Sequence, residues 1–227
     1  MRYQRSLLTA LTVLMVIGLA TPSWAIRRTK YGSASHLMGK TKLELGFGVR
    51  HHSDPHALSA WDYDGNYASS EGAIGRIALS HFGGKDFAFS MAYTIHDVEH
   101  ESWEYEDGWD ADETTIVHSL MFGMRYYFPQ SSPRSAIRPF VSAAAGPVFG
   151  TYIYDEEDPC GCETYSETHH TTVTGARLGG GVDFLMGPRW AIGFDAGYNF
   201  FEEFEHPIAG RQDYSGSEFG FNIGYLF

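Results

Sequence analysis

The stretch RHHSD, residues 50–54, carries the residue types of a hydrolytic site. A histidine close to a serine hydroxyl can accept its proton and make the oxygen a nucleophile, and a carboxylate such as Glu71 can orient the imidazole. Because histidines are frequent in the polar parts of this chain, the stretch also fits a plain solvated surface. His51, Ser53 and Glu71 are therefore candidate catalytic residues, as an alternative to a non-catalytic interpretation.

Histidines and carboxylates gather in four polar segments, at residues 51–71, 96–114, 152–170 and 201–213. Imidazole and thiolate suit Zn²⁺, Cu²⁺ or Ni²⁺, and carboxylates suit Ca²⁺ or Mg²⁺. None of the segments has the ligand spacing of a zinc finger or an EF-hand loop. The alternative is a solvated acidic surface that attracts cations as counter-ions. The candidate metal ligands are His96, His100, His169, His170, Cys160 and Cys162.

Cys160 and Cys162 are the only two cysteines. In an oxidising compartment they can pair, in a tight ring whose strain Gly161 would relieve. We expect this local disulfide in the third polar segment, with free thiols or an intermolecular bridge as the alternatives.

The elements that must position these residues begin with an export signal. A basic start, an apolar run over residues 7–20 and a small-x-small pattern ending at Ala25 are typical of a secretory signal peptide. The run is short for a membrane span, and no second stretch of 18 apolar residues follows. We expect a signal peptide over residues 1–25, a basic periplasmic segment over 26–41 and one domain over 42–227.

Eight stretches of the domain alternate bulky apolar residues with small, polar or charged ones, which predicts eight strands with two different faces. The apolar rows span residues 43–49, 77–79, 87–95, 116–128, 141–149, 176–186, 190–200 and 219–227.

The positions between the apolar rows include five arginines and four acids, a set that can pair inside a confined space. A polar interior behind an apolar outer wall is typical of a transmembrane β-barrel. Eight strands enclose a space that side chains fill, so a wide pore is disfavoured and only a narrow one is compatible. The predicted interior charges are Glu44, Arg50, Arg76, Arg125, Arg138, Arg177, Asp183, Asp195 and Glu218.

Short turns are expected near residues 83–84, 129–135 and 187–188, and the four polar segments are expected to be long loops at the other end. The loops hold 23 of the 28 acidic residues and one arginine, Arg211. Basic residues placed outside the barrel fall at the short-turn end. They are Arg27, Arg28, Lys30, Lys40, Lys42, Lys85, Arg134 and Arg189.

The export signal, alternating strands, long loops and aromatic last strand resemble the small OmpA/OmpX/OmpW-type outer-membrane barrels over Lys42 to Phe227. The resemblance implies an antiparallel up-and-down barrel with periplasmic termini and loops at the cell surface. It also implies that the barrel-assembly machinery reads the last strand, where Ile223, Tyr225 and Phe227 match the family's terminal pattern.

Strand parity places His51 and Ser53 on the lipid-facing row near the outer rim. A His-x-Ser pair there resembles the site of outer-membrane lipid A deacylases, although here it lies on the first strand rather than later in the chain. The resemblance implies an outer-leaflet lipid hydrolase as the alternative function.

We expect a non-enzymatic, monomeric outer-membrane protein of a Gram-negative bacterium with a structural or surface-interaction role, compatible with a narrow, porin-like pore. A divalent-metal-binding surface protein is a further alternative. The expected partners are outer-membrane lipid, lipopolysaccharide, the assembly machinery and a surface ligand, with no nucleic acid. No cofactor is expected beyond divalent cations at the loops.

Overall fold

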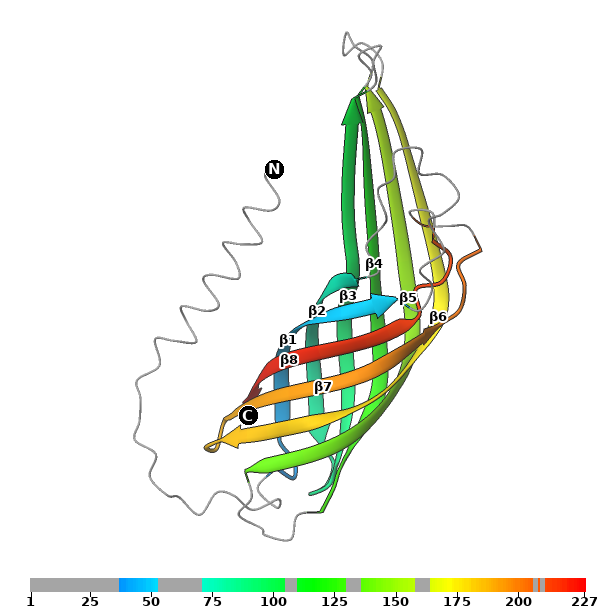
Figure 1. Cartoon of the computed structure of the whole chain (residues 1–227). Coiled ribbons are helices and arrows are strands. Elements are labelled where there is room, and N and C mark those ends of the chain that lie inside the picture. The colour runs from blue at the N-terminus through cyan, green and yellow to red at the C-terminus, as the bar shows by residue number, and fades with distance from the viewer. Residues whose placement is uncertain are drawn as a thin grey trace.

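Eight antiparallel strands close into an up-and-down barrel in the order β1 to β8 (Figure 1), as the alternation predicted. The computed structural model describes residues 37–52, 71–104, 110–129, 136–157, 164–205, 208 and 211–227. Among these residues, none forms a helix long and apolar enough to cross a membrane. The strands are β1 Thr41–His52, β2 Glu71–Phe82, β3 Phe87–Glu104, β4 Asp110–Tyr127, β5 Ile137–Glu157, β6 Thr164–Met186, β7 Trp190–Phe201 and β8 Gly216–Leu226.

The barrel closes where β8 pairs with β1, in a continuous register from Lys42 opposite Leu226 to His52 opposite Gly216. The last residue also takes part, because Thr41 and Phe227 exchange two backbone hydrogen bonds of 3.0 and 2.9 Å. Closure leaves the barrel wall without a free strand edge.

The predicted outward rows do face outward. Phe47, Phe89, Phe122 and Phe219 are about half exposed, whereas the intervening Ala88 is fully buried. Large apolar side chains therefore cover the outside of the barrel, and such a surface is stable only against an apolar solvent.

Three short connections join β2 to β3, β4 to β5 and β6 to β7 at one end of the barrel, as predicted. Gly187 in the last of them has a φ of 76°, a conformation that L side chains rarely adopt. The first polar segment lies mostly outside the described residues, which resume at Glu71.

The prediction of loops at residues 96–114 and 152–170 is wrong for most of both segments. Strands β3, β4, β5 and β6 run far beyond the other four and rise above the rim as a four-stranded sheet (Figure 1). Apolar alternation could not reveal these extensions, because both of their faces are largely polar. We call them the protruding sheet, comprising residues 97–104, 110–117, 150–157 and 164–171.

The sheet leaves the barrel at an irregularity in β3. The register between β3 and β4 shifts between Ile95 and Asp97, next to the point where β2 stops pairing with β3. Bulges are common at barrel rims, where they increase the local twist and re-aim the chain.

Candidate functional site

The barrel interior near the short-turn end holds a neutral quartet of two cations and two carboxylates. Glu44 accepts hydrogen bonds of 2.9 and 2.8 Å from the Arg125 guanidinium and one of 2.8 Å from Ser80. Lys42 lies 2.5 Å from Asp183 and 3.4 Å from Glu44. We call Lys42, Glu44, Arg125 and Asp183 the lower quartet; each charge has an opposite neighbour, as buried ions require.

A second neutral quartet lies above the first. Asp195 is 3.0 Å from the Arg76 guanidinium and 2.5 Å from that of Arg177. The same two arginines bind Glu218, with Arg177 Nε at 2.5 Å. We call Arg76, Arg177, Asp195 and Glu218 the upper quartet. The glycines between them leave the room that it needs, since a Cβ at Gly197 would lie 3.0 Å from the Arg177 guanidinium.

The other two predicted interior arginines belong to neither quartet. The Arg50 guanidinium lies 4.8 Å from the centre of the Phe201 ring, and that of Arg138 lies 4.9 Å from the centre of Tyr127. Arg138 also donates a 2.8 Å hydrogen bond to the carbonyl of Lys85. Stacking on an aromatic face is a common setting for a buried guanidinium.

Two residues were assigned to the wrong place from the sequence. Lys42 was placed among the basic residues outside the barrel, but it is buried and belongs to the lower quartet. Parity could have found it, because it lies two residues before the inward-facing Glu44. His96 was a candidate metal ligand in a loop, but it is buried in the barrel and hydrogen-bonds Ser119 at 2.7 Å.

Apolar residues close both ends of the interior. At the short-turn end, Leu37 packs against Phe82, Tyr127 and Phe140. At the other end, residues of the connection between β7 and β8 pack onto the barrel wall. This upper plug consists of Phe204, Ile208 and Tyr214 against Val117, Met121, Val148 and Phe201.

The plug corrects the prediction of a polar surface loop at residues 201–213. Phe204, Ile208 and Tyr214 are almost completely buried, and the Tyr214 hydroxyl donates to the Ile208 carbonyl at 2.7 Å. Arg211, expected on the loop surface, is also buried, with its guanidinium 5.4 Å from the centre of the Tyr214 ring.

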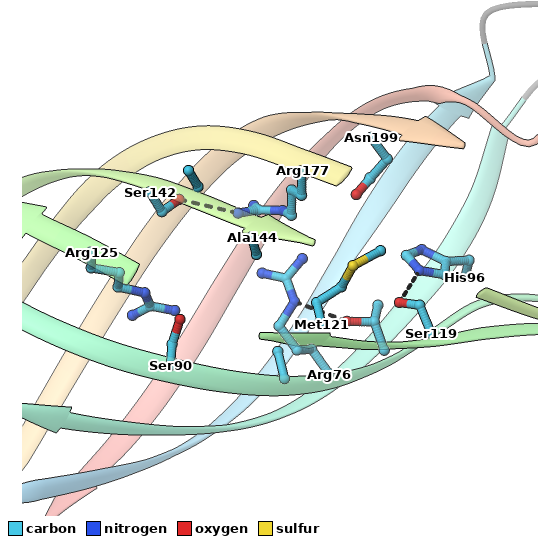
Figure 2. Close-up of a pocket in the computed structure, with 13 residues that line it drawn as sticks. Arg76, Ser90, His96, Ser119, Met121, Arg125, Ser142, Ala144, Arg177 and Asn199 are labelled. Carbon is cyan, nitrogen blue, oxygen red and sulfur yellow. Dashed lines mark hydrogen bonds between the residues drawn. The ribbon is translucent and has the colours of Figure 1, made fainter. Parts of the chain in front are cut away.

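A cavity of about 30 Å³ lies beside the two quartets and reaches up to Met121 of the plug (Figure 2). Arg76, Arg125 and Arg177 point toward it, together with His96 and Asn199. A space of this size accommodates one or two water molecules. Its lining combines cationic and polar side chains with Met121 and three alanines, and the arginines among them are engaged in the ion pairs described above.

The proposed hydrolytic residues are only partly placed. His51 is exposed near the end of β1 and lies opposite Glu71 in the register with β2. Ser53 lies outside the described residues. The backbones of His51 and Glu71 are therefore paired in the structure, and the position of Ser53 relative to them is not described.

Of the remaining metal candidates, only His169 and His170 have described side chains. His169 and His170 are exposed and consecutive on β6, so they point to opposite faces of the sheet. Only the backbone of His100 is described, in β3, and Cys160 and Cys162 lie outside the described residues. Across the described part of the chain, no three His, Cys, Asp or Glu side chains come close enough to hold a metal ion.

One face of the protruding sheet continues the inward-facing rows of the barrel and combines tyrosines with carboxylates. The rings of Tyr154 and Tyr165 meet edge to face at 6.4 Å, and those of Tyr152 and His169 lie 6.3 Å apart. We call this the aromatic–acidic face. It consists of Glu113, Tyr152, Tyr154, Glu156, Tyr165, Glu167 and His169.

Hydrogen bonds fix the carboxylates of this face. Glu167 accepts a 3.0 Å hydrogen bond from the Tyr165 hydroxyl and lies 2.7 Å from Nε2 of His169. Burial, followed by the charge and the hydrogen bond of Glu113, raises the pKa of Tyr152 to about 12. The face thus presents negative charge and aromatic rings in a fixed arrangement.

The three residues of the assembly-signal hypothesis lie on the outward-facing row of the last strand and its end. Ile223 and Phe227 are exposed on the outside of the barrel, and the Tyr225 ring lies 5.1 Å from that of Trp190. These aromatic side chains line the short-turn rim.

A family model described as the outer membrane protein beta-barrel domain matches residues 9–227. The chain is similar in structure to Ail, the attachment invasion locus protein of Yersinia pestis, solved in complex with the heparin analogue sucrose octasulfate. Sequence identity is 12% and the TM-score 0.48, over 84% of this chain and 99% of that one. The outer membrane protein OprG of Pseudomonas aeruginosa is 12% identical with a TM-score of 0.47, over 86% of this chain and 99% of that one. No curated protein matches the sequence.

Proposed function

The chain belongs to the outer membrane protein beta-barrel domain family, and we propose that it is a closed, non-enzymatic barrel that presents the protruding sheet to a partner at the cell surface. The observation that carries the proposal is the contrast between the interior and the sheet. The interior is filled by two ion-pair quartets and an apolar plug. The sheet has a face of tyrosines and carboxylates on which Tyr165, Glu167 and His169 are exposed and the other residues are half-buried, with Tyr152 packed against the plug.

The orientation follows from the same contrast. An acidic sheet fits the outer surface, where divalent cations bridge carboxylates to the phosphates of lipopolysaccharide. Both described chain ends lie at the short-turn end, which we place in the periplasm, within reach of the assembly machinery at Phe227. The lipid A hydrolase remains the less favoured alternative, because its His-x-Ser pair lies on the first strand and histidines are frequent in all the polar segments.

Two epitope insertions test this topology. A tag between β3 and β4, at residues 105–109, should be stained by antibody on intact cells. The same tag between β4 and β5, at residues 130–135, should be stained only after the outer membrane is permeabilised. The reverse pattern would contradict the proposal, and a heat-dependent shift in gel mobility would check that both variants fold.

A further inference from the structure

We propose that the aromatic–acidic face binds an extended segment of a partner protein that carries lysine and arginine side chains. The inference rests on the proposed function and names the chemistry of the partner. Its basis is the charge, the ring geometry and the spacing of the described residues on this face.

The protruding sheet contains many carboxylates but no lysine or arginine. No lysine or arginine occurs between Lys85 and Arg125, or between Arg138 and Arg177, the two stretches that contain the sheet. Acids number nine at residues 96–114 and six at 152–170. The interior arginines of the quartets already have carboxylate partners. Lysine and arginine side chains from outside are therefore the complementary charges.

The rings and carboxylates are arranged to take up such side chains. Tyrosine faces attract ammonium and guanidinium groups within about 6 Å of the ring centre. Tyr154 and Tyr165 are exposed enough to be reached from solvent, and Glu167 lies beside them, held by Tyr165 and His169. A cation stacked on a ring would find a carboxylate next to it.

The spacing favours an extended peptide over a single ion. The carboxylates of Glu113, Glu156 and Glu167 come from three different strands, with tyrosines at the neighbouring positions. Neighbouring strands lie about 4.8 Å apart and alternate residues about 6.8 Å apart. Alternate side chains of an extended peptide are also about 6.8 Å apart. Several cationic side chains on one extended peptide can therefore each lie near a carboxylate of this face.

The edge of β6 offers a place for the backbone of such a segment. From Thr164 to Val173, β6 has register partners on β5 only, whereas Thr174 already hydrogen-bonds Glu202 and the pairing with β7 begins at Gly175. An extended chain can add to an open strand edge through main-chain hydrogen bonds. Its inward side chains would then lie next to Tyr165 and Glu167.

The test uses the full barrel in detergent micelles and a fluorescent peptide of alternating lysine and threonine. Anisotropy should show saturable binding, and an alternating glutamate–threonine peptide should not bind. The triple variant Glu113→Gln, Glu156→Gln, Glu167→Gln should weaken binding about tenfold, from the loss of three ion pairs at the surface of the sheet. The uncharged substitution Tyr154→Leu should also weaken it severalfold, through loss of the ring face.

A matched control removes the same charge from the opposite face of the same sheet. Asp112→Asn, Asp155→Asn, Glu157→Gln changes exposed residues of the other parity and should alter the affinity less than about twofold. If both triple variants lost the same affinity for the peptide, the binding would be non-specific electrostatic attraction, and the proposal would be overturned. Three other outcomes would also overturn the proposal. The first is spermidine binding as tightly as the peptide, and the second is saturable Zn²⁺ binding that depends on the same residues. The third is that the peptide does not bind at all. The epitope experiment above is independent, so a sheet found at the surface that binds no peptide would refute this inference alone.

Discussion

Three of the four quartet carboxylates contact two cations each, whereas Asp183 contacts Lys42 and the Tyr127 hydroxyl. Glu44 lies between Arg125 and Lys42, and Glu218 lies between Arg76 and Arg177. Removing Glu44, Asp195 or Glu218 therefore leaves two cations without their shared partner. Because an unpaired charge in a confined interior is costly, the stability of the barrel depends on single residues here.

We expect Glu44→Gln to lower the free energy of unfolding by about 3–5 kcal/mol, since Arg125 would lose its charged partner. Urea unfolding in micelles, followed by tryptophan fluorescence, measures the change. The exposed Asp155→Asn is the control and should change stability by less than about 0.5 kcal/mol. Comparable small effects in both variants would show that the lower quartet contributes little.

Tyr152 gives the protruding sheet a specific pH response. Its pKa is raised to about 12, whereas an unfolded tyrosine loses its proton near pH 10. Between pH 10 and pH 12 the tyrosine ionises in the unfolded state but not in the folded state, which lowers the free energy of the unfolded state. The free energy of unfolding should therefore fall as the pH rises from 10 toward 12. Tyrosinate absorbance of the wild type, minus that of Tyr152→Phe, should titrate near 12. The pKa should fall in Glu113→Gln, and a wild-type titration near 10 would contradict the assignment.

Sequence parity reached most of the interior residues, and its failures have physical causes. Lys42 was misplaced because a lysine next to a basic terminal segment was grouped with that segment. His96 was misplaced because it stands between a row of apolar residues and a run of acids. Whether the His96 side chain points into the barrel depends on whether the strand continues through residue 96. The alternation of apolar residues alone does not locate the end of the strand.

At the scale of elements, the connection between β7 and β8 is the part whose structure differs most from a solvated loop. Its sequence is acidic, yet three of its apolar residues fill the barrel mouth: Phe204, Ile208 and Tyr214. The signal was present as isolated apolar residues among acids. It has no periodicity, because each residue packs through a loop conformation rather than through a strand face.

Phe204→Ala should destabilise the barrel by about 3–5 kcal/mol, because it opens a cavity in the upper plug. Phe200→Ala, four residues earlier on the exposed side of β7, is the matched control and should cost about 1 kcal/mol. Urea midpoints of the two variants in the same micelles provide the comparison. If Phe200→Ala were the more destabilising, the plug would not be a stable part of the fold.

The protruding sheet shows the limit of pattern-based prediction for whole strands. In the barrel, lipid contacts one face of each strand, so apolar residues alternate with small or polar ones. The strands can therefore be predicted from residues such as Phe87, Phe89 and Met91. Above the rim both faces meet water, so Thr, Tyr and acidic residues alternate without a contrast in polarity. Only the enrichment in β-branched and aromatic residues of β5 and β6 was available as a signal.

At the scale of the whole molecule, the filled interior predicts a barrel that does not conduct. The cavity of about 30 Å³ is lined by arginines of both quartets, and apolar clusters lie at the two ends of the interior. Planar bilayers containing the purified protein should show no stepwise conductance at moderate voltage. An unfolded sample in the same detergent controls for leakage, and reproducible single-channel steps from the folded protein alone would contradict the closed barrel.

The pairing of β1 with β8 has a consequence for how the molecule forms. Every other neighbouring pair of strands is a hairpin of adjacent segments, whereas this one joins Lys42 to Leu226, almost the whole domain apart. Contacts between distant parts of a chain form late, because the entropy of a large ring must be lost before they contribute. We expect the tall hairpins β3–β4 and β5–β6 to be threaded across the bilayer while the cylinder is still an open sheet, with the shortest strand, β8, sealing it last.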